Sequence, residues 1–562
     1  MLEKNHEAFH LKHNYKPYTL VLDRFYHWEK TSPKKVYLTQ PAEGKVTSYT
    51  FQKVGDQVRK MAQHLINLDL PPLTNIAIFS KNCAHWIMAD LAIWMAGHVS
   101  VPLYPTLSPE AMRQILEHSE ARVLFIGKLD GWDKLSPEVP TNIHKIALPL
   151  AIDSSLKKWV DIIQKTPALA NSPQPLAETL ATIIYTSGTT GNPKGVMHCF
   201  GAMAAAACSV SMLFRVTQKD RMMSYLPLSH VAERMCIEIM SLHEGIQIFF
   251  SDNLDTFLQD LNRAKPTLFF AVPRIWVKFQ LGILEKIPQN RLALMLKVPV
   301  LSRLIAKKIR EKLGLGHVRY AFSGAAPLPI DIMSLYRTIR INILEVYGMT
   351  ENFGYSHCSR PGFERLGYVG QANPAVVTKI DALGEILVFS PATMMGYFKE
   401  PEKTKKTFND EGFLKTGDVG EIDSEGRLKI TGRVKEIFKS SKGKYIAPSP
   451  IENKILALEW IEQVCVVGEQ MPQPIALLNL SIQAQKMNAA DIERLLVQAK
   501  KQVNKTLEAH ERIQSWVVVR ETWGMENGFV TPTLKLKRNV LEKHYQKWIE
   551  QWSKNKDDII WQ

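Results

Sequence analysis

Short apolar runs alternate with longer amphipathic stretches through the first two thirds of the chain. The apolar runs predict buried strands at Thr74–Ser80, Ala121–Gly127, Lys145–Leu150, Thr182–Tyr185, Thr267–Pro273 and Val318–Gly324. Between several of them the apolar positions follow a helical period, as in Ala84–Ala96 and Pro109–His118. Apolar strands separated by helices favour largely parallel sheets, so this region predicts a layered α/β domain.

The pattern changes twice toward the C-terminus. After about Asp381, Gly384–Ser390 and Gly420–Thr431 are typical of short strands, and Asp423-Ser-Glu-Gly426 is typical of a hairpin turn. They predict a small antiparallel, barrel-like unit that closes the large domain. Beyond Gly432 a separate α+β unit is predicted, with a helix from Ile451, strands Val464–Val467, Ile475–Ile482 and Ile513–Val519, and helices Ala490–Leu507 and Val540–Trp552. We therefore expect an N-terminal domain over residues 1–432 and a C-terminal domain over residues 433–562.

Composition narrows the class of protein. The 562 residues are 45% hydrophobic and 22% charged, which is typical of soluble multidomain proteins. No stretch predicts a membrane-spanning helix or a secretory signal, and the six cysteines form no C-x-x-C pair, so we expect a reducing cytoplasm. The net charge of +15 favours anionic ligands, and because no nucleic-acid-binding motif is present, nucleic acid is the weaker choice.

The most informative motif is Tyr185-Thr-Ser-Gly-Thr-Thr-Gly-Asn-Pro-Lys194-Gly195, directly after an apolar strand. Glycines let backbone N–H groups approach phosphate oxygens, hydroxyls add donors, and the lysine adds a positive charge. The order Pro-Lys-Gly excludes a Walker A motif, which needs Gly-Lys followed by Ser or Thr. The residues predicted to bind ATP phosphates are Thr186, Ser187, Gly188, Thr189, Thr190 and Lys194.

This motif resembles the signature of the adenylate-forming, AMP-binding enzymes, which include acyl-CoA synthetases, luciferases and peptide-synthetase adenylation domains. Further matches extend from about Leu226 to Arg538, so the resemblance covers nearly the whole chain. It implies that a carboxylic acid is joined to AMP at the expense of ATP, with Mg²⁺, and is then transferred to coenzyme A. It also implies that the C-terminal domain is mobile and rotates between the two half-reactions.

The resemblance assigns roles to residues around the nucleotide. In Tyr347-Gly-Met-Thr-Glu351, Tyr347 and Gly348 would contact AMP, Thr350 the α-phosphate, and Glu351, together with Thr186, the magnesium ion. Gly324 and Ala325 would lie along adenine, Asp418 would bind the ribose hydroxyls, and Arg433 would contact the nucleotide. Without the resemblance, a strand end, a helix cap, a turn and a surface basic pair remain alternative interpretations of these short motifs.

The C-terminal region carries three further assignments. Lys435 matches the hinge position, and Gly443 matches the loop that lines the coenzyme A tunnel, although Lys442 replaces a glycine that is usual there. Thr531-Pro-Thr-Leu-Lys535 matches the segment with the catalytic lysine; Lys535 is favoured, and Lys537 is the alternative. Without the resemblance, this basic run would be a solvated surface.

Two stretches resemble the long-chain fatty acid–CoA ligases, Ser224–Arg234 and Lys265–Trp276. By this resemblance His230 lies near the acyl site. Met197-His-Cys-Phe200, in the helix expected after the phosphate loop, departs from the usual Leu-Thr-His pattern, and the small residues of Gly201–Cys208 favour close helix packing over an acyl tunnel.

Several alternatives stay open. A fatty acyl-AMP ligase that loads a carrier protein is the nearest one, and a silent fatty-acid- or nucleotide-binding protein is another. Arg291–Leu313 is typical of an ordinary helix pair with a basic outer face, but it would also suit contact with the inner face of a membrane. Assembly as a homodimer is not decided by the sequence.

Overall fold

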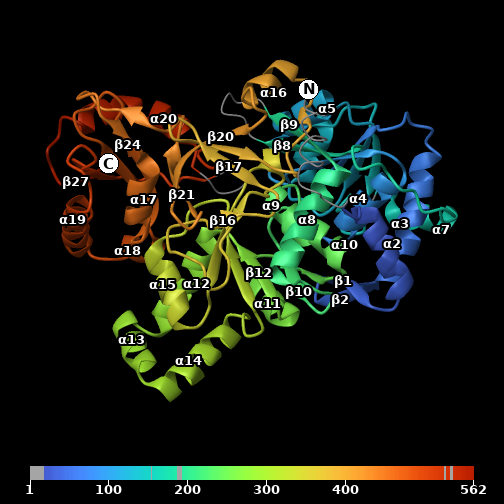
Figure 1. Cartoon of the computed structure of the whole chain (residues 1–562), viewed down its shortest axis with the longest axis horizontal. Coiled ribbons are helices and arrows are strands. Elements are labelled where there is room, and N and C mark those ends of the chain that lie inside the picture. Colours follow the sequence, from blue (N-terminus) through green and yellow to red (C-terminus); the bar gives the residue numbers. More distant parts are fainter. Residues whose placement is uncertain (1–17, 154, 187–192, 525–526, 532–535) are drawn as a thin grey trace.

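The computed structural model describes residues 18–153, 155–186, 193–524, 527–531 and 536–562 (Figure 1). The chain forms a large body of α/β layers, and a smaller unit of its last residues lies at one side of it. The predicted fold class is confirmed. Within the described residues, no helix is long and apolar enough to cross a membrane.

The largest sheet has eight strands in the order β19-β9-β8-β4-β3-β5-β6-β7. Their bounds are Gly396–Tyr397, Lys194–Cys199, Leu180–Thr186, Val99–Leu103, Asn75–Phe79, Val123–Ile126, His144–Ala147 and Lys157–Lys158. Strands β8 to β7 are parallel, as the apolar runs predicted. Helix α4 (Ala84–Met95) is buried at every residue, and its two polar side chains, His85 and Asp90, also lie inside the protein, where Arg234 pairs with Asp90.

The segment after the phosphate loop corrects one prediction. Lys194–Cys199 is not the start of a helix but strand β9, antiparallel to β8, and helix α8 (Phe200–Phe214) begins only at Phe200. Alternate burial of Val196 and His198 suits a strand, whereas the alanine-rich residues that follow suit a helix. The loop therefore joins two hairpin strands and does not lead into a helix N-terminus.

A second sheet, in the order β10-β11-β1-β2, was not predicted. Its strands are Arg221–Ser224, Gln247–Phe250, Val36–Ala42 and Lys45–Thr50. A third sheet contains β12 (Leu268–Ala271), β13 (Tyr320–Ser323), β14 (Ile343–Tyr347), β15 (His357–Cys358) and β16 (Gln371–Ala372). The predicted strand Thr267–Pro273 ends two residues early because Pro273 starts helix α12 (Pro273–Lys286).

Further helices lie around these sheets or, in the case of α13 and α14, project from them. They are α2 (Val21–Thr31), α3 (Phe51–Ile66), α5 (Pro109–Ser119), α6 (Trp132–Leu135), α7 (Trp159–Lys165), α9 (Val231–Glu233), α10 (Met240–Glu244), α11 (Phe257–Ala264), α13 (Gln289–Lys297), α14 (Pro299–Lys312), α15 (Ile330–Thr338) and α16 (Pro401–Thr407). Between α9 and α10, residues Arg234–Ile239 form a π-helix.

The antiparallel unit is a four-stranded sheet in the order β17-β18-β20-β21. Its strands are Val377–Ile380, Glu385–Phe389, Leu414–Ile422 and Leu428–Arg433. The predicted turn between the last two is present: the N–H of Gly426 donates to the Asp423 carbonyl at 2.9 Å, and Gly426 has φ +74°. The sheet begins a few residues before the boundary expected at Asp381.

The C-terminal unit contains a sheet in the order β24-β25-β26-β27, covered by helices. The elements are β22 (Phe438–Lys439), β23 (Tyr445–Ile446), α17 (Pro448–Leu456), β24 (Ile461–Val467), β25 (Ile475–Leu480), α18 (Ile482–Gln485), α19 (Ala489–Lys505), β26 (Trp516–Val518), α20 (Arg538–Trp552) and β27 (Ile559–Trp561). Two apolar cores made only of residues from Phe438 onward hold it together. The last strand, β27, was not predicted.

Candidate active site

A cavity of about 2330 Å³ is lined by residues from the four sheets of the body and from the C-terminal unit. Its walls include the C-terminal ends of β8 and β14, the strands β20 and β21, and residues of α17 and α20. Residues that are hundreds of positions apart in the sequence therefore line the same cavity.

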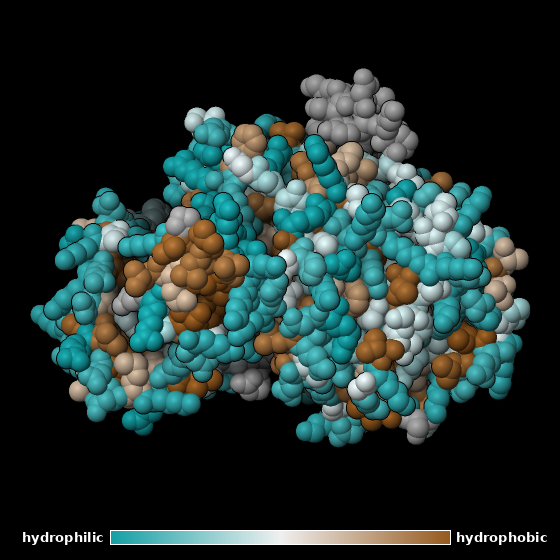
Figure 2. Space-filling view, turned by 90° about the horizontal axis from the view of Figure 1, so that it is seen from below, coloured by the Kyte–Doolittle hydropathy of each residue, from teal (hydrophilic) through white to brown (hydrophobic). Residues whose placement is uncertain are grey.

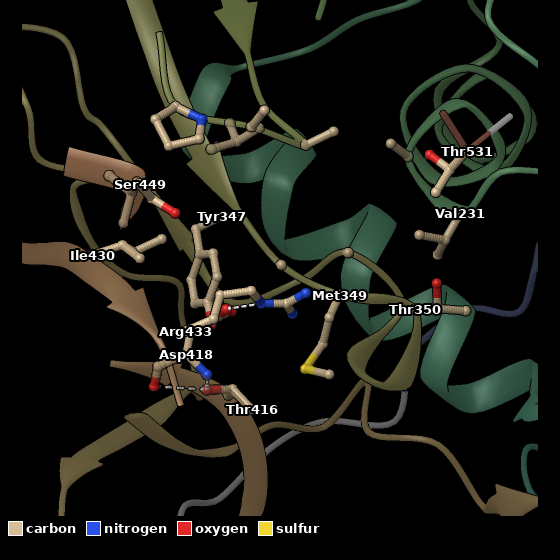
Figure 3. Close-up of a pocket in the computed structure, with 18 of the residues that line it drawn as sticks. Val231, Tyr347, Met349, Thr350, Thr416, Asp418, Ile430, Arg433, Ser449 and Thr531 are labelled. Atoms are coloured by element: carbon tan, nitrogen blue, oxygen red, sulfur yellow. Dashed lines mark hydrogen bonds and ion pairs between the residues drawn. The ribbon is translucent and has the colours of Figure 1, made fainter. Parts of the chain in front are cut away.

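One end of the cavity is built around the carboxylate of Asp418. Tyr347, the last residue of β14, donates its hydroxyl to Asp418 Oδ2 at 2.7 Å, and Arg433 Nε donates to Oδ1 at 2.7 Å (Figure 3). Strands β20 and β21 set Asp418 opposite Arg433 in the sheet. Burial raises the pKa of the Tyr347 phenol, so it remains a donor at neutral pH. Each carboxylate oxygen keeps further lone pairs that a vicinal diol could use.

Small residues shape the wall next to Tyr347. A Cβ on Gly348 would lie 2.4 Å from the carbonyl carbon of Gly354, and one on Gly324 would lie 2.6 Å from Val346 Cγ2. Gly348 lines the cavity, whereas Gly324 supports it from behind, and Ala325 lines it with a φ of +68°. At both positions the missing Cβ faces other parts of the protein, so the two glycines allow close packing within this wall.

The phosphate end contains Lys194, Glu351 and Tyr397. Lys194 opens β9 directly opposite Thr186, the last residue of β8. Its ammonium lies 5.1 Å from the centre of the Tyr397 ring, and the Tyr397 hydroxyl donates to Glu351 Oε1 at 2.7 Å. Partial burial lowers the pKa of Lys194, although nearby Glu351 opposes that shift. Ser187, Gly188, Thr189 and Thr190 lie outside the described residues.

His198 fixes the backbone beside this end. Its Nε2 lies 2.7 Å from the carbonyl oxygen of Thr350, and the ring is fully buried. Burial lowers the pKa of His198 to about 4, so the neutral ring donates this hydrogen bond at neutral pH. His198, which belongs to the stretch that departs from the Leu-Thr-His pattern, thus holds the backbone of Thr350 next to Glu351.

The residues here would suit a magnesium ion bound mainly through phosphate. Among the described residues, no group of three or more His, Cys, Asp and Glu side chains could hold a metal. Glu351 offers a carboxylate with one oxygen bonded to Tyr397 and further lone pairs available, and Thr186 offers a hydroxyl. Mg²⁺ commonly takes one or two protein oxygens together with phosphates and water, which matches this donor set.

An apolar arm of the cavity leads away from the phosphate end. It is lined by Val210, Phe214, Val216, Met222, Met235, Cys236, Met240, Leu268, Phe270 and Phe322. His230 lies on the cavity wall at the N-cap of α9 and accepts from the N–H of Ala232 at 3.2 Å. The small residues Ala202–Ala207 of α8 are buried in packing and do not line the cavity, which confirms the packing interpretation of that stretch.

Glu345 is a buried carboxyl group that the sequence analysis did not single out. It lines the cavity two residues before Tyr347, and its Oε2 has no hydrogen-bond partner among the described residues. Burial raises the pKa of Glu345 to about 7, although a backbone hydrogen bond at Leu328 opposes the shift.

Of the two C-terminal segments with predicted roles, the one around Thr531 borders the cavity and the one around Gly443 does not. Lys535 lies outside the described residues, but Thr531 and Leu536 on either side of it line the cavity, as does Lys537. Arg538 is held by Glu452 at 2.7 Å, which ties the start of α20 to α17. Lys435 also lines the cavity.

Gly443 is not brought to the cavity. It lies in the exposed turn between β22 and β23 with φ +77°. The structure therefore brings the predicted nucleotide and phosphate residues that it describes to one cavity, together with His230 and Lys435, except that Gly324 lies behind the wall and Gly443 lies elsewhere. The sequence analysis missed Tyr397, Glu345 and the contact of His198, because each depends on packing between distant segments.

Comparisons with known proteins agree with this arrangement. Residues 25–398 match the family described as AMP-binding enzyme, and residues 436–557 match the AMP-binding enzyme C-terminal domain. The chain therefore belongs to the AMP-binding enzyme family.

Two relatives illustrate the similarity in sequence. The long-chain-fatty-acid–CoA ligase FadD15 of Mycobacterium bovis is 30% identical, with 93% of this chain and 95% of the relative covered. The long-chain-fatty-acid–CoA ligase ACSBG2 of Rattus norvegicus is 28% identical, with 89% and 88% covered.

Solved structures share the fold at lower identity. The anthranilate CoA ligase AuaEII in complex with anthranoyl-AMP matches with a TM-score of 0.80 at 20% identity, covering 96% of this chain and 99% of that one. The adenylation domain of a carboxylate reductase from Mycobacterium chelonae matches with a TM-score of 0.81 at 21% identity, covering 98% and 93%.

Proposed function

We propose that this protein joins a long-chain fatty acid to coenzyme A through an acyl-adenylate, with release of pyrophosphate and then AMP. The observation that carries the proposal is one cavity that joins the Asp418 cluster, the Lys194–Glu351 end and an apolar arm. The long-chain-fatty-acid–CoA ligases among its relatives support the choice of acid.

Each part of the cavity would take one part of the reactants. Asp418 would accept hydrogen bonds from the ribose hydroxyls, Tyr347 would pack on adenine, and Thr350 would donate to the α-phosphate. Lys194 would neutralise the leaving phosphates, and Glu351 with Thr186 would hold Mg²⁺, which supplies charge neutralisation when it is bound. The acyl chain would occupy the apolar arm beyond His230.

The chemistry needs no nucleophilic side chain. In the first step an oxygen of the fatty carboxylate bonds to the α-phosphorus while the bond to pyrophosphate breaks. In the second step the thiol of coenzyme A gives up its proton to solvent, its sulfur bonds to the acyl carbon, and AMP leaves with the electron pair of the broken C–O bond. The protein contributes positioning and charge neutralisation.

ATP–pyrophosphate exchange with a panel of acids tests this proposal. Exchange should be fastest for unbranched acids of roughly 12 to 18 carbons, because each buried CH₂ adds up to about 0.8 kcal/mol of binding. Addition of coenzyme A should then yield the thioester. Faster exchange with acetate or an aromatic acid would overturn the choice of acid, and adenylate that accumulates unchanged with coenzyme A would overturn the choice of acceptor.

A further inference from the structure

Helices α13 and α14 form a hairpin that projects from the body, beside α12 and α15 (Figure 1). Only part of its surface packs on the protein. Leu292, Ala306 and Ile309 are buried in the core beneath it, and the Arg310 guanidinium donates to the Ile339 carbonyl at 2.8 Å. The hairpin is thus anchored along one side, and its other side faces solvent.

The outer side of the hairpin exposes a group of aliphatic side chains. The exposed fractions are 67% for Leu294, 52% for Val298, 71% for Val300, 41% for Leu301 and 62% for Leu304. Figure 2 shows a broad hydrophobic patch, ringed by hydrophilic side chains, at the place that α13 and α14 occupy in Figure 1. Single exposed leucines are ordinary, but a contiguous patch of this kind marks an interaction surface.

The charges around this patch have one sign. Residues 289–313 contain seven Lys or Arg and a single acidic residue, Glu311. Lys297, Arg303, Lys307 and Lys308 are exposed. Glu311 lies 3.8 Å from Lys307, and among the described side chains of the hairpin no other of these four cations forms an ion pair.

The exposed aliphatic patch and the positive charges around it together favour one kind of binding partner. A second copy of the chain would bring the same positive ring against this one, and like charges would repel. Protein interfaces are also depleted in lysine relative to the rest of the protein surface. An anionic bilayer suits both features, since it accepts aliphatic side chains below its headgroups and attracts lysine and arginine at its surface.

We propose that the α13–α14 hairpin docks on the surface of an anionic phospholipid bilayer. Leu294, Val300 and Leu304 enter the boundary of the acyl chains, and the flanking lysines and arginines contact the phosphates. This places the enzyme at a membrane, where an insoluble acid would be found. Vesicle binding does not require catalysis, so its outcome is distinguishable from a failure of the proposed ligase activity.

Vesicle flotation of the full chain tests the proposal. The protein should bind vesicles of phosphatidylcholine with about 30% phosphatidylglycerol and should bind pure phosphatidylcholine at least tenfold less tightly, because each cation near an anionic surface contributes about a factor of five. Arg303→Glu with Lys307→Glu should lose at least tenfold, whereas Lys45→Glu with Lys53→Glu, an equal change of charge on exposed residues of β2 and α3, should not.

A second pair of variants tests the contribution of the aliphatic side chains to vesicle binding. Leu301→Ser with Leu304→Ser should lower vesicle binding at least tenfold. Leu254→Ser with Leu383→Ser changes two leucines that are 85% and 84% exposed elsewhere, and should leave binding unchanged. Circular dichroism checks that every variant is folded.

Hydrogen exchange locates the contact without a substitution. Amides within residues 294–308 should exchange more slowly when anionic vesicles are added, and those near Leu383 should not. The proposal is overturned if the protein does not bind anionic vesicles, or if both hairpin variants bind like the wild type. It is also overturned if sedimentation shows a dimer that the Leu301→Ser, Leu304→Ser variant abolishes while vesicles leave the hairpin unprotected.

Discussion

The carboxylate of Glu351 receives a hydrogen bond from a neutral donor, Tyr397, and forms no direct ion pair with Lys194, whose ammonium lies over the same tyrosine ring. Its charge is therefore available to a metal ion. Glu351→Gln should slow adenylation at least about a hundredfold, since lost metal ligation costs several kcal/mol in the transition state. Pyrophosphate exchange across a magnesium titration measures this effect.

Tyr397→Phe is the matched control for that change. It removes the donor to Glu351 but leaves the carboxylate and the aromatic ring under Lys194, so the loss should be roughly tenfold or less. Equal losses in the two variants would mean that Glu351 acts only through its hydrogen bond.

Glu345 should make stability depend on pH. Its folded-state pKa is raised to about 7 from an ordinary value of 4.5, so the native state binds the proton more tightly than the unfolded state. The free energy of unfolding should then fall as pH rises from about 4.5 to about 7, by up to about 3 kcal/mol. Glu345→Gln is uncharged at every pH and should remove this part of the slope. Urea denaturation at pH 5 and pH 7.5 tests it, and identical slopes in both proteins would contradict it.

The nucleotide motifs could be recognised in the sequence because the residues of each motif lie in one contiguous stretch. Tyr347 and Glu351 belong to one pentapeptide, and Asp418 closes a turn-like tetrapeptide. The partners of these residues could not be predicted. Tyr397 reaches Glu351 across 46 positions and His198 reaches Thr350 across 152, and only the folded chain brings such pairs together.

At the scale of elements, two glycines lie in opposite surroundings: Gly348 is closely packed, and Gly282 lies on the open surface of a helix. Gly348→Ala would force a Cβ to within 2.4 Å of the Gly354 backbone, so it should lower the free energy of unfolding by about 1–3 kcal/mol.

Gly282 lies on the exposed surface of α12, with no atom within 4 Å of an added Cβ. Gly282→Ala should raise the free energy of unfolding by about 0.5–1 kcal/mol, because alanine favours the helix. Denaturant titration measures both, and shifts of the same sign would contradict this assignment.

Elements with a clear period were predicted to within a few residues. Apolar runs located β3, β5 and β8, and the turn sequence at Asp423–Gly426 located the β20–β21 hairpin. The helix expected after the phosphate loop was wrong, because the six residues of β9 are too few to show a period. The sheet of β10, β11, β1 and β2 was missed. Its β1–β2 hairpin, with Glu43 and Gly44 between the strands, is local and was overlooked, whereas β1 also pairs with the distant β11, and local sequence carries no signal for that pairing.

At the scale of the whole molecule, the C-terminal unit has its own apolar cores and yet lines the cavity. The division into residues 1–432 and 433–562 and the rotation of the second part remain predictions. In the arrangement described, Thr531 and Leu536 face the cavity, whereas Gly443 lies in an exposed turn outside it. If the unit does rotate, this arrangement is the one that serves adenylation, and the Gly443 turn would replace the Lys535 segment for the second step.

This division of labour predicts opposite defects in two variants. When the carboxylate approaches ATP, several negative oxygens meet at one phosphorus, and an ammonium group there lowers the barrier. The thiol attack instead needs a narrow passage for pantetheine, which a glycine permits because it has no Cβ. Lys535→Ala should therefore abolish acyl-adenylate formation but still convert supplied acyl-adenylate to the thioester, and Gly443→Leu should do the reverse.

The controls for this pair lie close by in the chain. Lys537→Ala tests the alternative lysine, which lines the cavity, and Lys442→Ala changes the exposed neighbour of Gly443 without adding bulk to the turn. Lys435→Pro should impair whichever half-reaction needs the conformation that proline forbids, because Lys435 lies in the segment between β21 and β22. Single-turnover assays of each half-reaction separate these outcomes. Equal loss of both half-reactions in folded Lys535→Ala and Gly443→Leu proteins would show that the two steps do not use different arrangements of the C-terminal unit.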